Sequence, residues 1–190
     1  MTPEPISVQE HRHLLTRQRF LKELVRFGAL AFAVAFLLPA LALKSLSRPK
    51  EAIAKGDVLT YAQSIGGAQA GQVVKASDLA VNQSVQAFPQ GKSGNEKNIV
   101  ELVRIAEGSG ADGLVAYSAI CKHLGCTVAT NLNQQGLIIC PCHGSEYDPR
   151  QHAKVVRGPA PLPLPSLPIT TSNGDQVTVN GPFSGPIGPQ

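Results

Sequence analysis

CKHLGC at residues 121–126 and CPCHGSEY at residues 140–147 hold all four cysteines of this chain and two of its five histidines. Each stretch has a cysteine followed by a histidine two or three positions later, and each has one further cysteine. Two such pairs on facing loops can hold a 2Fe–2S cluster, with two thiolates on one iron and two imidazoles on the other. The two remaining cysteines, one in each stretch, can clip the loops together.

Cysteine and histidine also suit two other kinds of site. Structural zinc takes the same four ligands, but zinc loops usually pair cysteine with cysteine and histidine with histidine. Here each stretch mixes the two residue types and adds a spare cysteine. A thioredoxin-like thiol pair needs C-x-x-C beside a βαβ pattern, whereas residues 140–142 form C-x-C and no such pattern surrounds them. The spacing favours the iron–sulfur cluster and leaves zinc as the alternative.

The two stretches resemble the cluster-binding boxes of Rieske iron–sulfur proteins, which read C-T-H-L-G-C and C-P-C-H-G-S. Residues 155–161, VVRGPAP, resemble the proline loop that covers the cluster in the Rieske subunits of cytochrome bc-type complexes. The resemblance is specific over residues 114–165 and looser elsewhere. It implies one Rieske-type 2Fe–2S cluster.

The resemblance also implies a role for each cysteine and histidine of the two boxes. The implied ligands are Cys121 and Cys140 on the inner iron, and His123 and His143 on the outer, solvent-facing iron. The two other cysteines, Cys126 and Cys142, would form a disulfide. Such a bond requires an oxidising compartment, so we expect the cluster domain to lie outside the cytoplasm.

Ser145 and Tyr147 stand at positions whose hydroxyls, in the family, donate to a bridging sulfide and to a cysteine sulfur. Rieske clusters have potentials between about −150 and +300 mV, and hydrogen bonds to sulfur help to set the value. With both donors present, we expect a high-potential centre. Lys122 replaces the usual threonine of the first box. A cation beside the cluster would favour its reduced form, but we expect a surface lysine that solvent screens.

The rest of the sequence indicates a small β domain. The chain has 190 residues, and its 18 glycines and 15 prolines favour turn-rich β structure over a helical bundle. Its net charge of +4 is too small and too dispersed to indicate nucleic-acid binding. Residues 172–175, SNGD, predict a hairpin, and residues 100–105 fit either a strand or a helical turn. Strands are expected at residues 72–75, 84–88, 98–105, 114–119, 127–130, 136–140, 167–171 and 176–179.

Residues 27–43 contain no charged residue. Seventeen residues rise about 26 Å as a helix, which is at the short end of the range for a membrane span. We therefore expect one transmembrane helix there. The alternative is a cleaved signal peptide, whose apolar core is usually about 7–15 residues, because residues 40–42 have the A-x-A form of a cleavage site.

Charge on either side of this segment predicts the topology. Basic residues before it, Arg12, Arg17, Arg19, Lys22 and Arg26, favour a cytoplasmic N-terminal segment 1–26. Residues 16–22, TRQRFLK, resemble a twin-arginine export signal in which Gln18 replaces the second arginine. We expect a flexible tether at 44–60 and a Rieske domain at 61–190, with its cluster-binding part at about 119–162. The expected fold is mostly β: a small antiparallel β domain with a cluster-binding subdomain, anchored in the inner membrane and facing the periplasm.

The resemblance implies the Rieske subunit of a membrane quinol–cytochrome c oxidoreductase. Such a subunit takes one electron from quinol and works with cytochrome b-type and cytochrome c-type subunits in a respiratory chain. His143 would contact quinol and accept its proton, assisted by His123, and Leu124 would help to close the quinol pocket. The alternative is an anchored electron-transfer subunit of another oxidoreductase, such as an arsenite-oxidase-like enzyme.

Overall fold

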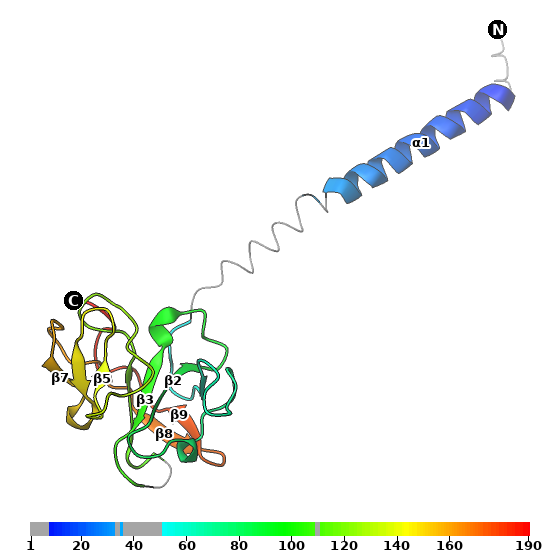
Figure 1. The fold of residues 1–190 in the computed structure, drawn as a ribbon. Helices are drawn as coiled ribbons and strands as arrows, with labels where there is room; N and C mark the ends of the chain where they lie inside the picture. The colour runs from blue at the N-terminus through cyan, green and yellow to red at the C-terminus, as the bar shows by residue number, and fades with distance from the viewer. Residues whose placement is uncertain (1–7, 33–34, 36–50, 109–110) are drawn as a thin grey trace. The chain divides into compact units, whose positions relative to one another are not determined.

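The computed structural model describes residues 8–32, 35, 51–108 and 111–190. It divides into two compact units, residues 1–49 and residues 50–190. Of the first unit the structure describes mainly one helix, α1, which spans Val8–Phe32 (Figure 1). Every strand of the described residues belongs to the second unit.

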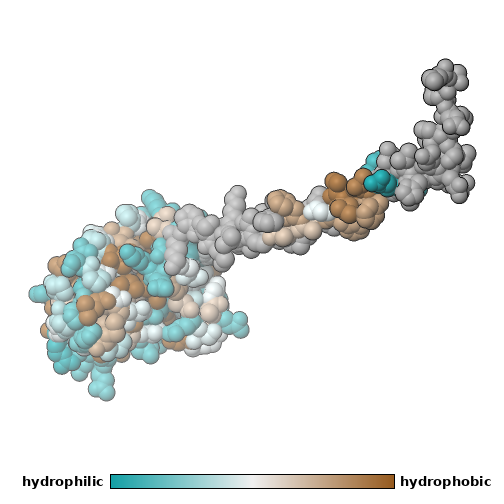
Figure 2. Space-filling view, turned by 90° about the horizontal axis from the view of Figure 1, so that it is seen from above, coloured by the Kyte–Doolittle hydropathy of each residue, from teal (hydrophilic) through white to brown (hydrophobic). Residues whose placement is uncertain are grey.

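Exposed hydrophobic side chains cover much of the described part of α1, where Figure 2 shows them in brown. They are Phe20, Leu21, Leu24, Val25, Phe27 and Phe32. Among the described residues, no helix is both long enough and apolar enough to cross a membrane. The transmembrane helix predicted at 27–43 overlaps the end of α1, and its residues 33–34 and 36–43 lie outside the described part of the chain.

The base of the β domain is a four-stranded antiparallel sheet in the order β1-β2-β3-β4. Its strands are β1 Leu59–Tyr61, β2 Ser84–Pro89, β3 Val100–Arg104 and β4 Leu114–Ser118. Most of the ambiguous segment 100–105 is therefore a strand, β3, which lies in the interior of the sheet between β2 and β4. The strand predicted at 72–75 is wrong, because Val73 and Lys75 make only isolated bridges, and β1 was not predicted.

A second sheet builds the subdomain that carries the two cysteine stretches, coloured yellow in Figure 1. Its strands are β5 Ile138–Ile139, β6 Glu146–Asp148 and β7 Lys154–Arg157, all antiparallel. The strand predicted at 127–130 is wrong, because Thr127 makes a single bridge to Ile120. Three 3₁₀ helices connect the elements of the domain: η2 Ala76–Asp78, η3 Glu96–Asn98 and η4 Pro149–Gln151.

The predicted C-terminal hairpin is confirmed. Strands β8 Ile169–Ser172 and β9 Gln176–Val179 pair in register around the turn. The turn residues Asn173, Gly174 and Asp175 all have positive φ, the conformation that asparagine, aspartate and glycine tolerate best.

Two hydrophobic cores lie on opposite faces of the base sheet. Along β3, Val100 and Leu102 join the core shared with the β8–β9 hairpin, whereas Val103 joins the core of the cluster subdomain. Successive strand residues point to opposite faces, so β3 is buried on both sides. As a result, every residue of this strand is buried, including Glu101, which is 0% exposed.

The β domain begins earlier than predicted. The carbonyl of Glu51 accepts a hydrogen bond of 2.7 Å from Asn98, and the backbone N–H of Ile53 donates to the same side chain at 3.1 Å. Asp57 forms an ion pair of 2.9 Å with Lys92. Residues 51–60 therefore pack as part of the domain, and its start moves from residue 61 to residue 51. The remainder of the predicted tether, residues 44–50, lies outside the described residues.

Candidate metal centre

The two cysteine stretches fold into loops with the same hydrogen-bond pattern. In the first, the N–H of Cys121 donates to the carbonyl of Cys126 at 2.8 Å, and Gly125 donates back to Cys121 at 3.1 Å. In the second, Cys140 donates to Ser145 at 2.8 Å, and Gly144 donates back to Cys140 at 3.0 Å. Both glycines have positive φ, which turns each loop tightly enough to return to its own first cysteine.

These loops bring the predicted ligands together with unequal access to solvent. Cys121 and Cys140 are free thiols and are both buried. His123 is partly buried, and its Nδ1 is buried without a hydrogen-bond partner among the described residues. His143 is exposed, and its ring meets that of His123 edge-to-face, with centroids 4.7 Å apart.

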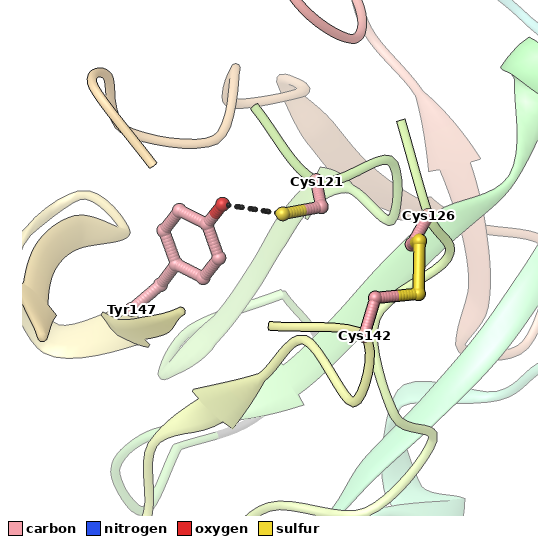
Figure 3. The surroundings of a disulfide bond; sticks show 4 residues. All are labelled: Cys121, Cys126, Cys142 and Tyr147. Carbon is pink, nitrogen blue, oxygen red and sulfur yellow. Dashed lines mark hydrogen bonds between the residues drawn. A yellow bond between two sulfur atoms is a disulfide. The ribbon is translucent and has the colours of Figure 1, made fainter. Parts of the chain in front are cut away.

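A disulfide joins the two loops, as predicted, between Cys126 and Cys142 (Figure 3). Its two sulfurs and the sulfur of Cys140 all lie within 4.8 Å of one another. The disulfide removes Cys126 and Cys142 from the set of free ligands. It leaves one thiol and one histidine on each loop.

The chemistry of this donor set fits a metal cluster. Burial and the neighbouring Cys121 thiol raise the pKa of Cys140, which favours the neutral form of this thiol when no metal is bound. A coordinating metal ion deprotonates such thiols outright. A bound metal would also give the buried Nδ1 of His123 a partner. Without one, a buried ring nitrogen that makes no hydrogen bond is unfavourable.

Tyr147 provides the predicted hydrogen bond to sulfur. Its hydroxyl lies 3.1 Å from the sulfur of Cys121 (Figure 3) and accepts a hydrogen bond of 3.2 Å from the N–H of Lys122. Since that N–H occupies an acceptor site of the hydroxyl, the phenolic proton is available to the sulfur. Burial, followed by the bond to Cys121, raises the pKa of Tyr147 far above its ordinary value, so the donor stays protonated.

The proline loop closes over the second box. The hydroxyl of Ser145 is buried and accepts a hydrogen bond of 3.1 Å from the N–H of Ala160. Its own proton is not used in this hydrogen bond, so the donation from Ser145 to a cluster sulfur stays a prediction. Gly158 has a φ of +92°, and a Cβ there would lie 2.5 Å from Cα of Ser145. Only glycine lets the loop approach this closely.

Leu124 and Leu162 are exposed apolar residues beside this centre. Leu124, at the tip of the first loop, is 64% exposed, and Leu162, which follows the proline loop, is 43% exposed. Leu124 is therefore at the surface, next in sequence to the candidate ligand His123.

Lys122 corrects an expectation. It is only 3% exposed, and its ammonium donates a hydrogen bond of 3.0 Å to the carbonyl of Pro186. Burial lowers the pKa of this lysine. The prediction of a solvent-screened surface lysine was wrong, because residues 181–190 cover it. Nothing in the sequence of that Gly/Pro-rich segment indicated contact with the first box. His152, in contrast, is exposed.

Comparisons with known proteins agree with this geometry. A family model described as the Rieske [2Fe-2S] domain matches residues 70–168, which is more than half of the chain. The "Putative respiratory nitrate reductase subunit Rieske" of Haloferax mediterranei is 35% identical, over 98% of this chain and 86% of its own length. The cytochrome bc1 complex Rieske iron–sulfur subunit of Streptomyces lividans is 31% identical, over 61% of this chain and 78% of its own.

Among solved structures, the plasma membrane Rieske protein PetC3 of Synechocystis PCC 6803 is similar to this chain. It is 29% identical and covers 57% of this chain and 97% of its own, with a TM-score of 0.43. The family match spans both cysteine loops and the proline loop. The centre is thus the site of a Rieske 2Fe–2S cluster, and this chain belongs to the Rieske iron–sulfur protein family.

Proposed function

We propose that this Rieske protein, an electron-transfer subunit of a respiratory complex, serves a membrane quinol oxidoreductase of the cytochrome bc type. It would take one electron from quinol and pass it to a c-type cytochrome or an equivalent acceptor. One observation carries the proposal: His143 and Leu124 are both exposed, whereas Cys121 and Cys140 are buried. A quinol can therefore reach the imidazole side of the centre, while protein covers the thiolate side.

Cys121 and Cys140 would hold the inner iron, and His123 and His143 the outer one. When bound, the cluster supplies a one-electron acceptor of high potential. The imidazole of His143 accepts the hydrogen bond of a quinol hydroxyl and then its proton. His123 is less exposed and contributes mainly as the second ligand. Leu124 provides an apolar wall for the quinol ring.

The anchor completes the proposal. Residues 27–43 would cross the cell membrane, with residues 1–26 in the cytoplasm and the β domain on the periplasmic side. Residues 44–50 would then be the tether that allows the domain to move between a cytochrome b-type and a cytochrome c-type subunit. The disulfide between Cys126 and Cys142 supports a location outside the cytoplasm.

A second candidate is the Rieske subunit of a respiratory nitrate reductase. The 35% identity to the Haloferax mediterranei protein of that name extends over 98% of this chain and favours it. In this candidate, as in the arsenite-oxidase-like alternative of the sequence analysis, the chain would still be a membrane-anchored electron-transfer subunit. It differs from the first candidate in its partner.

An inhibitor of quinol oxidation distinguishes the two candidates in native membranes. If the centre forms half of a quinol site, the inhibitor should change the EPR spectrum of the reduced cluster, and a b-type cytochrome should co-purify with the chain. An unchanged spectrum, together with co-purified nitrate reductase activity, would reject the first candidate in favour of the second.

A further inference from the structure

Residues 181–190 lie against the cluster subdomain, and we call them the C-terminal strap. The N–H of Ser184 donates to the carbonyl of Ser166 at 2.8 Å, and the N–H of Ser166 donates to the hydroxyl of Ser184 at 2.9 Å. Further along the strap, the ring of Pro189 lies close to Gly125 of the first loop, since a Cβ built on that glycine would be 3.4 Å from it. The strap thus extends from Ser166, beyond the proline loop, to the first cluster-binding loop.

The strap buries a cation. Lys122 is 3% exposed, and its ammonium has one recorded acceptor, the carbonyl of Pro186 at 3.0 Å. None of the ion pairs formed by the described residues includes this lysine. The same residue borders an open groove of about 470 Å³, which His152, residues 162–166 and the strap also line. Burying a cation without a counter-charge is unfavourable, so this arrangement calls for a negative charge close by.

The cluster is the candidate for that negative charge. Lys122 lies between Cys121 and His123, and consecutive Cα atoms are about 3.8 Å apart, so its ammonium is within roughly 10 Å of the backbone of both. Two thiolates and the electron gained on reduction make the reduced centre the more negative form. A buried cation at this distance favours that form, whereas a solvent-screened one has little effect.

We propose that the charge of Lys122 raises the midpoint potential of the cluster, and that the strap keeps this charge effective by shielding the side chain from most of the solvent. The proposal rests on the ligand set proposed above and is independent of quinol oxidation. With an effective dielectric constant of about 20, one charge roughly 10 Å away changes the ratio of reduced to oxidised cluster by on the order of tenfold. For a one-electron couple this corresponds to about 59 mV.

Redox titration of the full-length, cluster-loaded chain tests the charge. The titration is followed by EPR at pH 6, far below the ordinary lysine pKa. Lys122→Gln keeps an N–H donor for Pro186 but has no charge, so its potential should fall by about 59 mV. Lys122→Arg keeps the charge and should retain most of the potential. The exposed Lys154, mutated to Met, is the matched control and should leave the potential unchanged.

Deletion of residues 184–190 tests the strap. Lys122 then keeps its charge but becomes solvated, so the potential should fall nearly as far as in Lys122→Gln. If Lys122→Gln loses its cluster, Lys122→Met serves as the neutral variant instead. An unchanged potential in a neutral variant with full cluster content would overturn the charge effect. A normal potential after the deletion would overturn the role of the strap. A purely structural role would lower thermal stability without moving the potential.

Discussion

Glu101 is a buried acid whose ionisation should govern how the stability of the β domain depends on pH. It lies on β3, paired with Gln86 on β2 and Tyr117 on β4, and it is 0% exposed. Neither carboxyl oxygen has a hydrogen-bond partner among the described residues. The nearby hydroxyl of Ser84 and amide of Gln86 donate instead to the carbonyls of Thr130 and Val128.

Burial raises the pKa of Glu101 from 4.5 to about 8, and Ser84 and Gln86 offset this only in part. The folded chain therefore holds this proton up to about pH 8, whereas the unfolded chain releases it above pH 4.5. Between these values the unfolded state binds fewer protons, so the free energy of unfolding falls by about 1.4 kcal/mol per pH unit. From pH 5 to 8.5 the loss amounts to about 4 kcal/mol.

Glu101→Gln removes this ionisation while keeping the shape of the side chain. The assay is the thermal unfolding midpoint of the cluster-loaded chain from pH 5 to 8.5, followed by circular dichroism. Other groups titrate too, so the informative quantity is the difference between variant and wild type. That difference should move in favour of the variant by roughly 10 °C over this range, given about 2–4 °C per kcal/mol for a chain of this size.

The exposed Glu96 supplies the control, since Glu96→Gln should follow the wild-type curve. A constant offset of Glu101→Gln at every pH would refute the reasoning. It would mean that the folded domain holds Glu101 ionised, for example through ordered water, despite its burial.

Three further predictions concern the centre. Tyr147→Phe removes a donor to a cysteine sulfur, so the midpoint potential should fall by roughly 60 mV in a redox titration. The control is Tyr117→Phe, which loses a buried hydrogen bond to the carbonyl of Pro149 and should leave the potential unchanged. Gly158→Ala places a Cβ against Ser145 and should lower the thermal midpoint of cluster loss, whereas an unaffected midpoint would show that the loop can shift. Cys142→Ser should speed cluster loss under air, measured by the visible absorbance, because the two loops are then no longer joined; equal loss rates would argue against it.

Local sequence determined the centre itself. In each of the stretches CKHLGC and CPCHGS, the glycine with positive φ and two of the four candidate ligands lie within six consecutive residues. Short-range hydrogen bonds within each loop then close it on its own first cysteine. The Asn173–Gly174 hairpin was predictable for the same reason, since its turn depends on adjacent residues only.

Long-range packing decided what the sequence could not show. Alternation along β3 leaves open which face is covered, and only the two cores reveal that Glu101 lies inside. The segment 72–75 has strand-like residues but lacks a neighbouring strand that pairs with it along its length. Lys122 is buried because Pro186, 64 residues away, lies over it. Residue types and short spacings thus specify which chemistry is present, whereas burial, and with it the charge and potential of each group, depends on contacts between residues far apart in the chain.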